Sequence, residues 1–133
     1  MEILVDTSVW IDFFKGVNSP GAACLHKMLE AEDPVCISDV ILVETLQGFR
    51  NHEEFESAKI HLLHFPLYSL QSPEGYVRAA QLFRNCRKQG ITIRKTIDCL
   101  IAQIALDHGL ILLHQDSDFD KIASVSSLRI YHP

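Results

Sequence analysis

The sequence lacks the features that would place it in a membrane or outside the cell. Its longest apolar runs, such as residues 40–43 and 110–113, are far too short to span a bilayer. The first residues show no basic start followed by an apolar stretch, so we expect no secretory signal. The 4 cysteines form no Cys-x-x-Cys pair and lie among apolar neighbours, which favours buried free thiols over disulfides or a zinc site. We therefore expect a cytoplasmic protein without a membrane partner.

Internal repeats, low-complexity tracts and linkers are also missing from the 133 residues. Hydrophobic residues make up 47% of the chain and charged residues 22%, which is the balance of a folded protein and not of a disordered one. The length is sufficient to bury a core without disulfide or metal support. We expect a single domain over residues 1–133.

Short apolar segments alternate with helical patterns along the whole chain. Strands are predicted at residues 3–5, 35–37, 64–67, 110–113 and 128–131, and helices at 9–14, 20–30, 40–49, 52–61, 73–89, 97–108 and 117–123. Strands that are apolar throughout and alternate with helices indicate an α/β fold with a parallel sheet covered on both faces. In such sheets ligands bind outside the carboxyl ends of the strands, where the strand order reverses.

Two aspartates follow predicted strands. Asp6 comes directly after the first strand, and Asp116 follows the strand at residues 110–113. If these strands are neighbours, both carboxylates face one crevice. Each acid also precedes a predicted helix, and for either one alone a helix cap explains it at least as well as a catalytic role.

Two further acids lie inside helical patterns that are rich in apolar residues. Glu44 follows a run of four apolar residues, and Asp98 has apolar residues at the next helical turn. A helix with so little polar surface is expected to be largely buried, where an isolated carboxylate is costly. The alternative is an ordinary paired or partly exposed acid, and Arg94 lies four residues before Asp98 as a possible partner. We favour a functional role for both.

Gathering four carboxylates in one crevice requires a compensating cation or protonation of some of them. At about 4 Å, two such charges repel by roughly 4 kcal/mol at an effective dielectric near 20. No histidine or cysteine stands at metal-ligand spacing, and oxygen ligands alone suit Mg²⁺ or Mn²⁺ and not zinc. An ion of this kind could generate hydroxide and stabilise charge on a phosphodiester.

The net charge of −5 argues against a nucleic-acid partner, but the charge distribution does not. Six of the 12 Lys and Arg residues fall in residues 78–95, and no acid lies between Glu74 and Asp98. A local basic stretch can hold phosphates on an acidic protein, because screening limits the field to about 8–10 Å. A solvated helix face is the simpler reading of such a run by itself. The basic stretch ends just before Asp98, and this position favours RNA binding by Arg87, Lys88 and Arg94.

Four segments in this order resemble the PIN domains of VapC-type toxins, and the resemblance covers the whole chain. They are Val5-Asp6-Thr7-Ser8-Val9-Trp10-Ile11-Asp12, the helix that carries Glu44, Thr96-Ile97-Asp98-Cys99-Leu100-Ile101-Ala102, and Asp116-Ser117-Asp118-Phe119. The resemblance implies a PIN domain with a five-stranded parallel sheet of order 3-2-1-4-5 between helices, and Mg²⁺-dependent endoribonuclease activity. It also implies a toxin homodimer and a small antitoxin with a DNA-binding N-terminal part.

By match of residues, the resemblance implies that Asp6, Glu44, Asp98 and Asp116 form the catalytic site, with Asp6, Asp98 and Asp116 as metal ligands. Asp118 would be an auxiliary acid, and Thr7 a hydroxyl that supports the metal-bound water. His114 departs from the family pattern, in which Thr or Ser is usual. We expect its ring to be satisfied by a backbone carbonyl.

Other Mg²⁺-binding α/β families fit less well. A receiver-type signalling domain needs paired acids after the first strand and a lysine near the fifth, and this chain has Asp6-Thr7 and no lysine at residues 112–115. A haloacid-dehalogenase-type phosphatase needs a second aspartate two residues after the first, where Ser8 stands. A non-catalytic RNA-binding PIN domain remains as the alternative, but such domains normally lose some of the acids. All four are present here, which favours the enzyme.

Overall fold

All 133 residues are described by the computed structural model, which has a five-stranded parallel sheet at its centre. Its strands run in the order β3-β2-β1-β4-β5, and every neighbouring pair is parallel. The predicted α/β fold and strand order are therefore confirmed. The strands are β1 (Ile3–Val5), β2 (Val35–Ser38), β3 (Leu67–Tyr68), β4 (Ile111–Leu113) and β5 (Arg129–Ile130).

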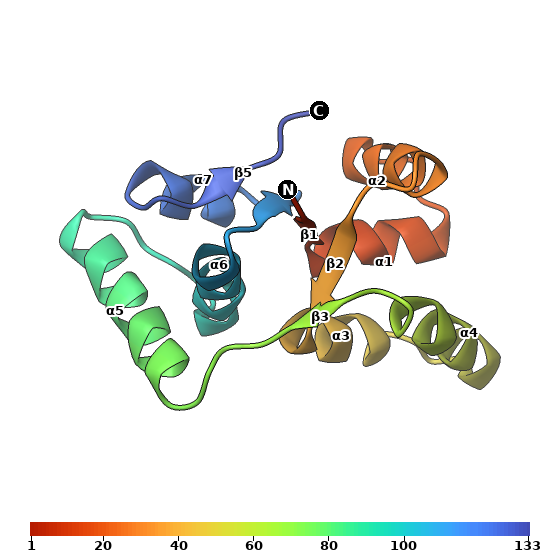
Figure 1. Cartoon of the computed structure of the whole chain (residues 1–133), viewed down its shortest axis with the longest axis horizontal. Coiled ribbons are helices and arrows are strands. Elements are labelled where there is room, and N and C mark those ends of the chain that lie inside the picture. The colour runs from red at the N-terminus through yellow and green to blue at the C-terminus, as the bar shows by residue number, and fades with distance from the viewer.

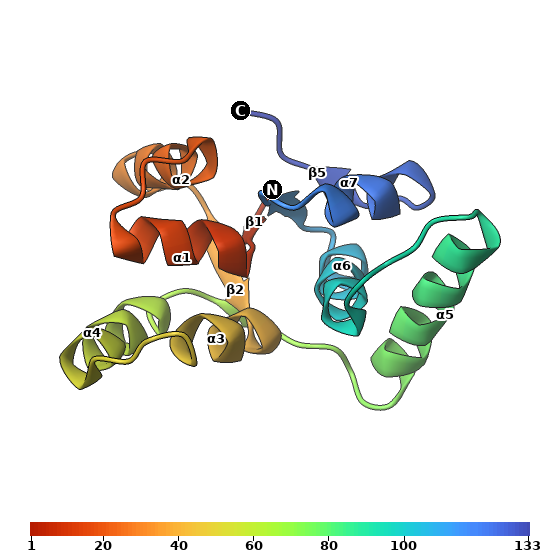
Figure 2. The same ribbon diagram turned by 180° about the vertical axis from the view of Figure 1, so that it is seen from behind.

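Helices cover the sheet on both sides, as Figures 1 and 2 show from opposite directions. One group comprises α1 (Thr7–Lys15), α2 (Pro20–Glu30), α3 (Asp39–Leu46) and α4 (His52–Leu62). The other comprises α5 (Glu74–Lys88), α6 (Thr96–His108) and α7 (Ser117–Ser124). The chain first builds the sheet outward from β1 to β3 and then crosses back to β4 and β5. Because crossover connections are right-handed, this reversal places the two groups on opposite faces.

Several helix and strand ends differ from the prediction. α3 ends at Leu46 and not at residue 49, and β3 is Leu67–Tyr68 where residues 64–67 had been expected. α6 begins at Thr96, one residue before the expected start at residue 97, and Lys95 before it makes no side-chain cap. Asp6 and Asp116 do cap α1 and α7, each accepting a hydrogen bond from the backbone N–H two residues later.

The core lies along the central strands and the helix faces that meet them. Leu4 and Val5 on β1 and Leu112 on β4 are fully buried. The prediction that the helix carrying Glu44 is largely buried is wrong, because only Ile41 and Thr45 of α3 are buried and Val43 is 57% exposed. None of the helices combines the length and apolar character that a membrane crossing requires.

Candidate active site

Asp6 and Asp116 lie at neighbouring strand ends. β1 pairs in parallel with β4, with Val5 opposite Leu113. The backbone N–H of Asp6 donates to the carbonyl of Leu113 at 2.9 Å. Asp116 follows Leu113 after two intervening residues. The adjacency of these two strands, on which the predicted crevice depended, is therefore present.

Hydroxyl groups of α1 hold the acids on one side of the cluster, which we call the hydroxyl side (Asp6, Glu44, Thr7 and Ser8). The Ser8 hydroxyl donates to Asp6 Oδ2 at 2.8 Å, and the Thr7 hydroxyl donates to Glu44 Oε1 at 2.8 Å. Asp6 is buried and Glu44 is half-buried. Burial raises the pKa of Asp6, and the charge of Glu44 adds to the rise, although hydrogen bonds from Ser8 and Thr7 oppose it. This side contains no cation within ion-pair distance.

Asp98 lies in the first turn of α6 and is only 6% exposed. Its Oδ2 atom is buried and has no hydrogen-bond partner. Burial, followed by the charges of Asp116, Asp6 and Asp118, raises the pKa of Asp98 to about 6. A carboxylate of this kind is unstable without a nearby cation or a bound proton.

Cations balance the acids on the other side, which we call the cation side (Asp116, Asp118, Arg94 and Lys121). Arg94 Nε donates to Asp118 Oδ2 at 3.1 Å, and its terminal nitrogen reaches Asp116 Oδ1 at 3.4 Å. Lys121 Nζ lies 3.5 Å from Asp118 Oδ1. Burial alone would raise the pKa of Asp118, but the hydrogen bond and charge of Arg94 and the charge of Lys121 outweigh it and lower that pKa. Arg94 pairs with these two acids and makes no hydrogen bond with Asp98, for which the sequence had offered it as a possible partner.

The loop that carries Asp116 is held by two side chains for which the sequence predicts no such role. His114 Nδ1 accepts the backbone N–H of Asp116 at 3.0 Å, and its Nε2 lies 3.1 Å from Asp120 Oδ1. The expected carbonyl partner of His114 is therefore wrong. Gln115 donates to Asp12 at 2.9 Å and accepts the backbone N–H of Gly21 at 2.9 Å. Only the position of these residues just before Asp116 could have drawn attention to them, since their partners are distant in sequence.

The predicted RNA-binding residues do not form one group. Arg94 belongs to the cation side, with its side chain 66% exposed. Arg87 and Lys88 are exposed at the end of α5, and the Arg87 guanidinium lies 5.5 Å from the centre of the Phe83 ring. Both have free donors, whereas Arg94 is already engaged by carboxylates.

The donor set fits a hard divalent cation. Asp98, Asp116 and Asp118 each offer a carboxylate oxygen, and these three atoms lie within 4.8 Å of one another. The trio contains Asp118, which had been expected as auxiliary, and not Asp6, which had been expected as a ligand. Oxygen-only ligands together with an unpartnered buried oxygen on Asp98 match what Mg²⁺ or Mn²⁺ requires.

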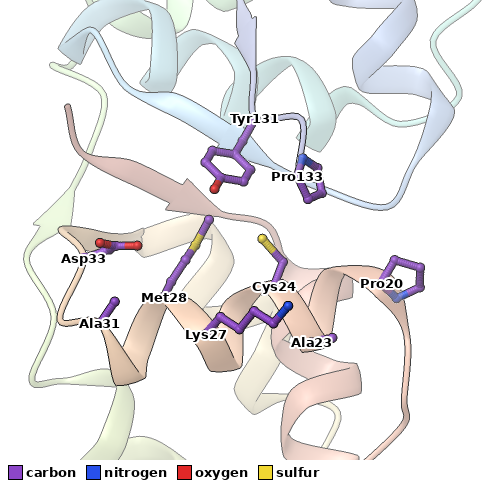
Figure 3. Close-up of a pocket in the computed structure, with 9 residues that line it drawn as sticks. All are labelled: Pro20, Ala23, Cys24, Lys27, Met28, Ala31, Asp33, Tyr131 and Pro133. Atoms are coloured by element: carbon purple, nitrogen blue, oxygen red, sulfur yellow. The ribbon is translucent and has the colours of Figure 1, made fainter.

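A separate hollow of about 400 Å³ lies between α2 and the segment that follows β5. Figure 3 shows Cys24, Lys27 and Met28 on one side of it and Tyr131 on the other. It contains none of the acids discussed above. The carboxylate cluster, and not this hollow, is the candidate active site.

Comparison with known proteins identifies relatives over nearly the whole chain. Residues 3–125 match the family model described as PIN domain. The chain is 30% identical over 128 residues to VapC ribonuclease Mb1587 of Mycobacterium bovis and to ribonuclease VapC11 of Mycobacterium tuberculosis, which covers 96% of each chain.

Solved structures share the fold at lower sequence identity. VapBC2 from Rickettsia felis, crystallised with a DNA fragment from its promoter, superposes with a TM-score of 0.76 at 16% identity, with 98% of both chains covered. VapC20 of Mycobacterium tuberculosis, a toxin that cleaves the sarcin–ricin loop, superposes with a TM-score of 0.72 at 17% identity, covering 96% of this chain and 98% of the other. These likenesses concern the arrangement of strands and helices.

Proposed function

The chain belongs to the PIN-domain family, and we propose that it is an endoribonuclease toxin that depends on Mg²⁺ or Mn²⁺ and cleaves RNA at the carboxylate cluster. The observation that carries the proposal is the buried, unpartnered Asp98 oxygen beside two further acids. The names of the relatives, VapC ribonucleases, support RNA as the substrate. A receiver-type signalling domain has no support among these relatives.

The acids have different surroundings, and we assign each of them a catalytic role on that basis. Asp98, Asp116 and either Asp6 or Asp118 would hold the cation. When bound, a divalent cation supplies positive charge to a phosphodiester and lowers the pKa of nearby water. Glu44 is half-buried and accepts a hydrogen bond from the Thr7 hydroxyl, which supports a role in accepting a proton from attacking water. Asp6 accepts a hydrogen bond from the Ser8 hydroxyl, which orients its carboxylate within the cluster.

Arg87 and Lys88 provide the contact with the RNA backbone in this proposal. Both are exposed, carry free donors and lie on a stretch without acids. Changing both to Gln should weaken binding to all RNAs and lower the salt dependence by about 0.7 per lost phosphate contact on a single strand. Loss of affinity for one RNA alone, with an unchanged salt slope, would contradict this role.

A small antitoxin with a DNA-binding N-terminal part is the proposed partner, since the similar structures include VapBC complexes. An arginine of its C-terminal part would suit the acid cluster, because a guanidinium pairs with carboxylates through two parallel hydrogen bonds. Exposed apolar side chains support contacts with the antitoxin or with a second toxin copy. They include Val43 on α3 and Ile60 on α4, each more than half exposed.

Cleavage of RNA by the purified protein tests the proposal. We expect cleavage with Mg²⁺ or Mn²⁺, none with EDTA, and a loss of at least about 100-fold in Asp98→Asn. Asp33→Asn, which changes an exposed aspartate outside the cluster, is the matched control. RNA binding without cleavage under any metal condition would instead support the non-catalytic RNA-binding PIN domain.

A further inference from the structure

Arg94 is the cation in closest contact with the acid cluster. It lies on the segment between α5 and α6, and its guanidinium donates to Asp118 at 3.1 Å and to Asp116 at 3.4 Å. These two acids belong to the trio whose oxygen atoms lie within 4.8 Å of one another. The guanidinium therefore contacts two of the three carboxylates whose oxygen atoms lie close enough together to share an ion.

The contact differs from an ordinary surface ion pair because its acidic partner is desolvated. The Asp118 side chain is 1% exposed and has Asp98 and Asp116 close by. An ionised carboxylate in such surroundings needs a cation. Lys121, at 3.5 Å from the other Asp118 oxygen, is the only other cation paired with it. Arg94 thus supplies positive charge that the cluster requires.

We infer that Arg94 and a divalent cation compete for Asp116 and Asp118, so that binding of the ion releases the Arg94 guanidinium. This inference rests on the proposed metal-binding function. A guanidinium and a divalent ion on the same carboxylates repel each other. Both also need the same lone pairs of the carboxylate oxygens. The Arg94 side chain is 66% exposed and has no hydrogen bonds other than these two, so its release breaks no other hydrogen bond.

Calorimetric titration of the full chain with Mn²⁺, at fixed pH and ionic strength, tests this inference. Arg94→Gln removes the competing charge, and we expect it to bind Mn²⁺ about fivefold more tightly than the wild type. Arg94→Lys keeps the charge but loses the planar fork, so its affinity should fall between the two. Arg84→Gln is the matched control, because Arg84 lies on α5 and contacts Gln81 and no carboxylate. Its affinity should stay within about twofold of the wild type.

Melting temperatures provide a second, independent readout. In EDTA, Arg94→Gln should melt below the wild type because the acids lose a counter-ion, and Mn²⁺ should raise its melting temperature by more. Equal or weaker Mn²⁺ binding by Arg94→Gln would overturn the inference. Arg94 would then have no effect on ion binding, or it would be needed to form the site. Asp98→Asn separates the two proposals. If it titrates like the wild type, the metal site itself is wrong and the inference falls with it.

Discussion

The two sides of the acid cluster use different chemistry to hold the same kind of group. On the hydroxyl side, Asp6 and Glu44 are held by the neutral donors Ser8 and Thr7. On the cation side, Asp118 is paired with Arg94 and Lys121. As a result, the pKa of Asp6 is raised by burial, whereas the pKa of Asp118 is lowered.

The difference shows that burial alone does not decide how an acid behaves. Asp6 and Asp118 are both almost fully buried, at 5% and 1% exposure. A hydroxyl donor orients a carboxylate without cancelling its charge, and a guanidinium does both. Asp98 has one oxygen unpartnered, and burial together with the charges of Asp116, Asp6 and Asp118 raises its pKa to about 6.

The largest effect is expected from Asp98→Asn in EDTA. The pKa of Asp98 is raised from 3.8 to about 6, so the folded protein takes up a proton more readily than the unfolded chain. The stability that the wild type gains from this bound proton is fully present below the pKa of Asp98 in the unfolded chain. It is lost as pH rises through about 6. At neutral pH the variant should therefore be more stable than the wild type, by up to about 3 kcal/mol. Near pH 4 this advantage should be gone.

Urea unfolding at several pH values between about 4 and 7 measures this difference. Asp33→Asn, which removes the charge of an exposed aspartate outside the cluster, is the matched control. A difference between Asp98→Asn and the wild type that stays constant over this range would show that Asp98 is not destabilised by its surroundings.

Asp118→Asn should change the free energy of unfolding at neutral pH in the opposite direction to Asp98→Asn. The pKa of Asp118 is lowered, so its ion pairs stabilise the protein above the unfolded pKa, and this stability is lost as pH falls. At neutral pH in EDTA we expect the variant to lose about 2 kcal/mol, the size of a hydrogen bond to a charged group. The same unfolding series measures it. If Asp118→Asn stabilised the protein instead, the described difference between the hydroxyl side and the cation side would be wrong.

The sequence predicts the positions of the acids better than their partners. Asp6 and Asp116 could be placed because they follow apolar strands, and parallel strands end at the same edge of a sheet. Asp98 could be predicted as buried from the apolar residues around it. Glu44 could not, because α3 exposes Val43 and buries little of its surface.

The partners depend on contacts between residues far apart in the chain. Arg94 stands one helical turn before Asp98, which suggested that pairing, but Arg94 lies before the start of α6 at Thr96. Its side chain instead reaches Asp116 and Asp118, more than twenty residues later. Gln115 likewise binds Asp12 and Gly21 across about a hundred residues. No local pattern encodes such contacts, since they follow from the packing of α1, α2 and α7 around the sheet.

The smallest effect is expected on the hydroxyl side, from Thr7→Val. The variant keeps the shape of the side chain and removes the hydroxyl that donates to Glu44 at 2.8 Å. Because Glu44 is half-buried and regains water, we expect a loss of about 1 kcal/mol in the free energy of unfolding. Thr7→Ser retains the hydroxyl and should lose less.

A double-mutant cycle with Glu44→Ala, which removes the acceptor, isolates this hydrogen bond from other effects of each substitution. If the hydroxyl and the carboxylate interact as described, the two single changes should cost more in sum than the double change, by about 1 kcal/mol. The same cycle on Ser8→Ala and Glu44→Ala should be additive, because Ser8 donates to Asp6 and not to Glu44. Additivity in the Thr7 cycle would mean that Thr7 does not orient Glu44, and the hydroxyl side would then hold only Asp6.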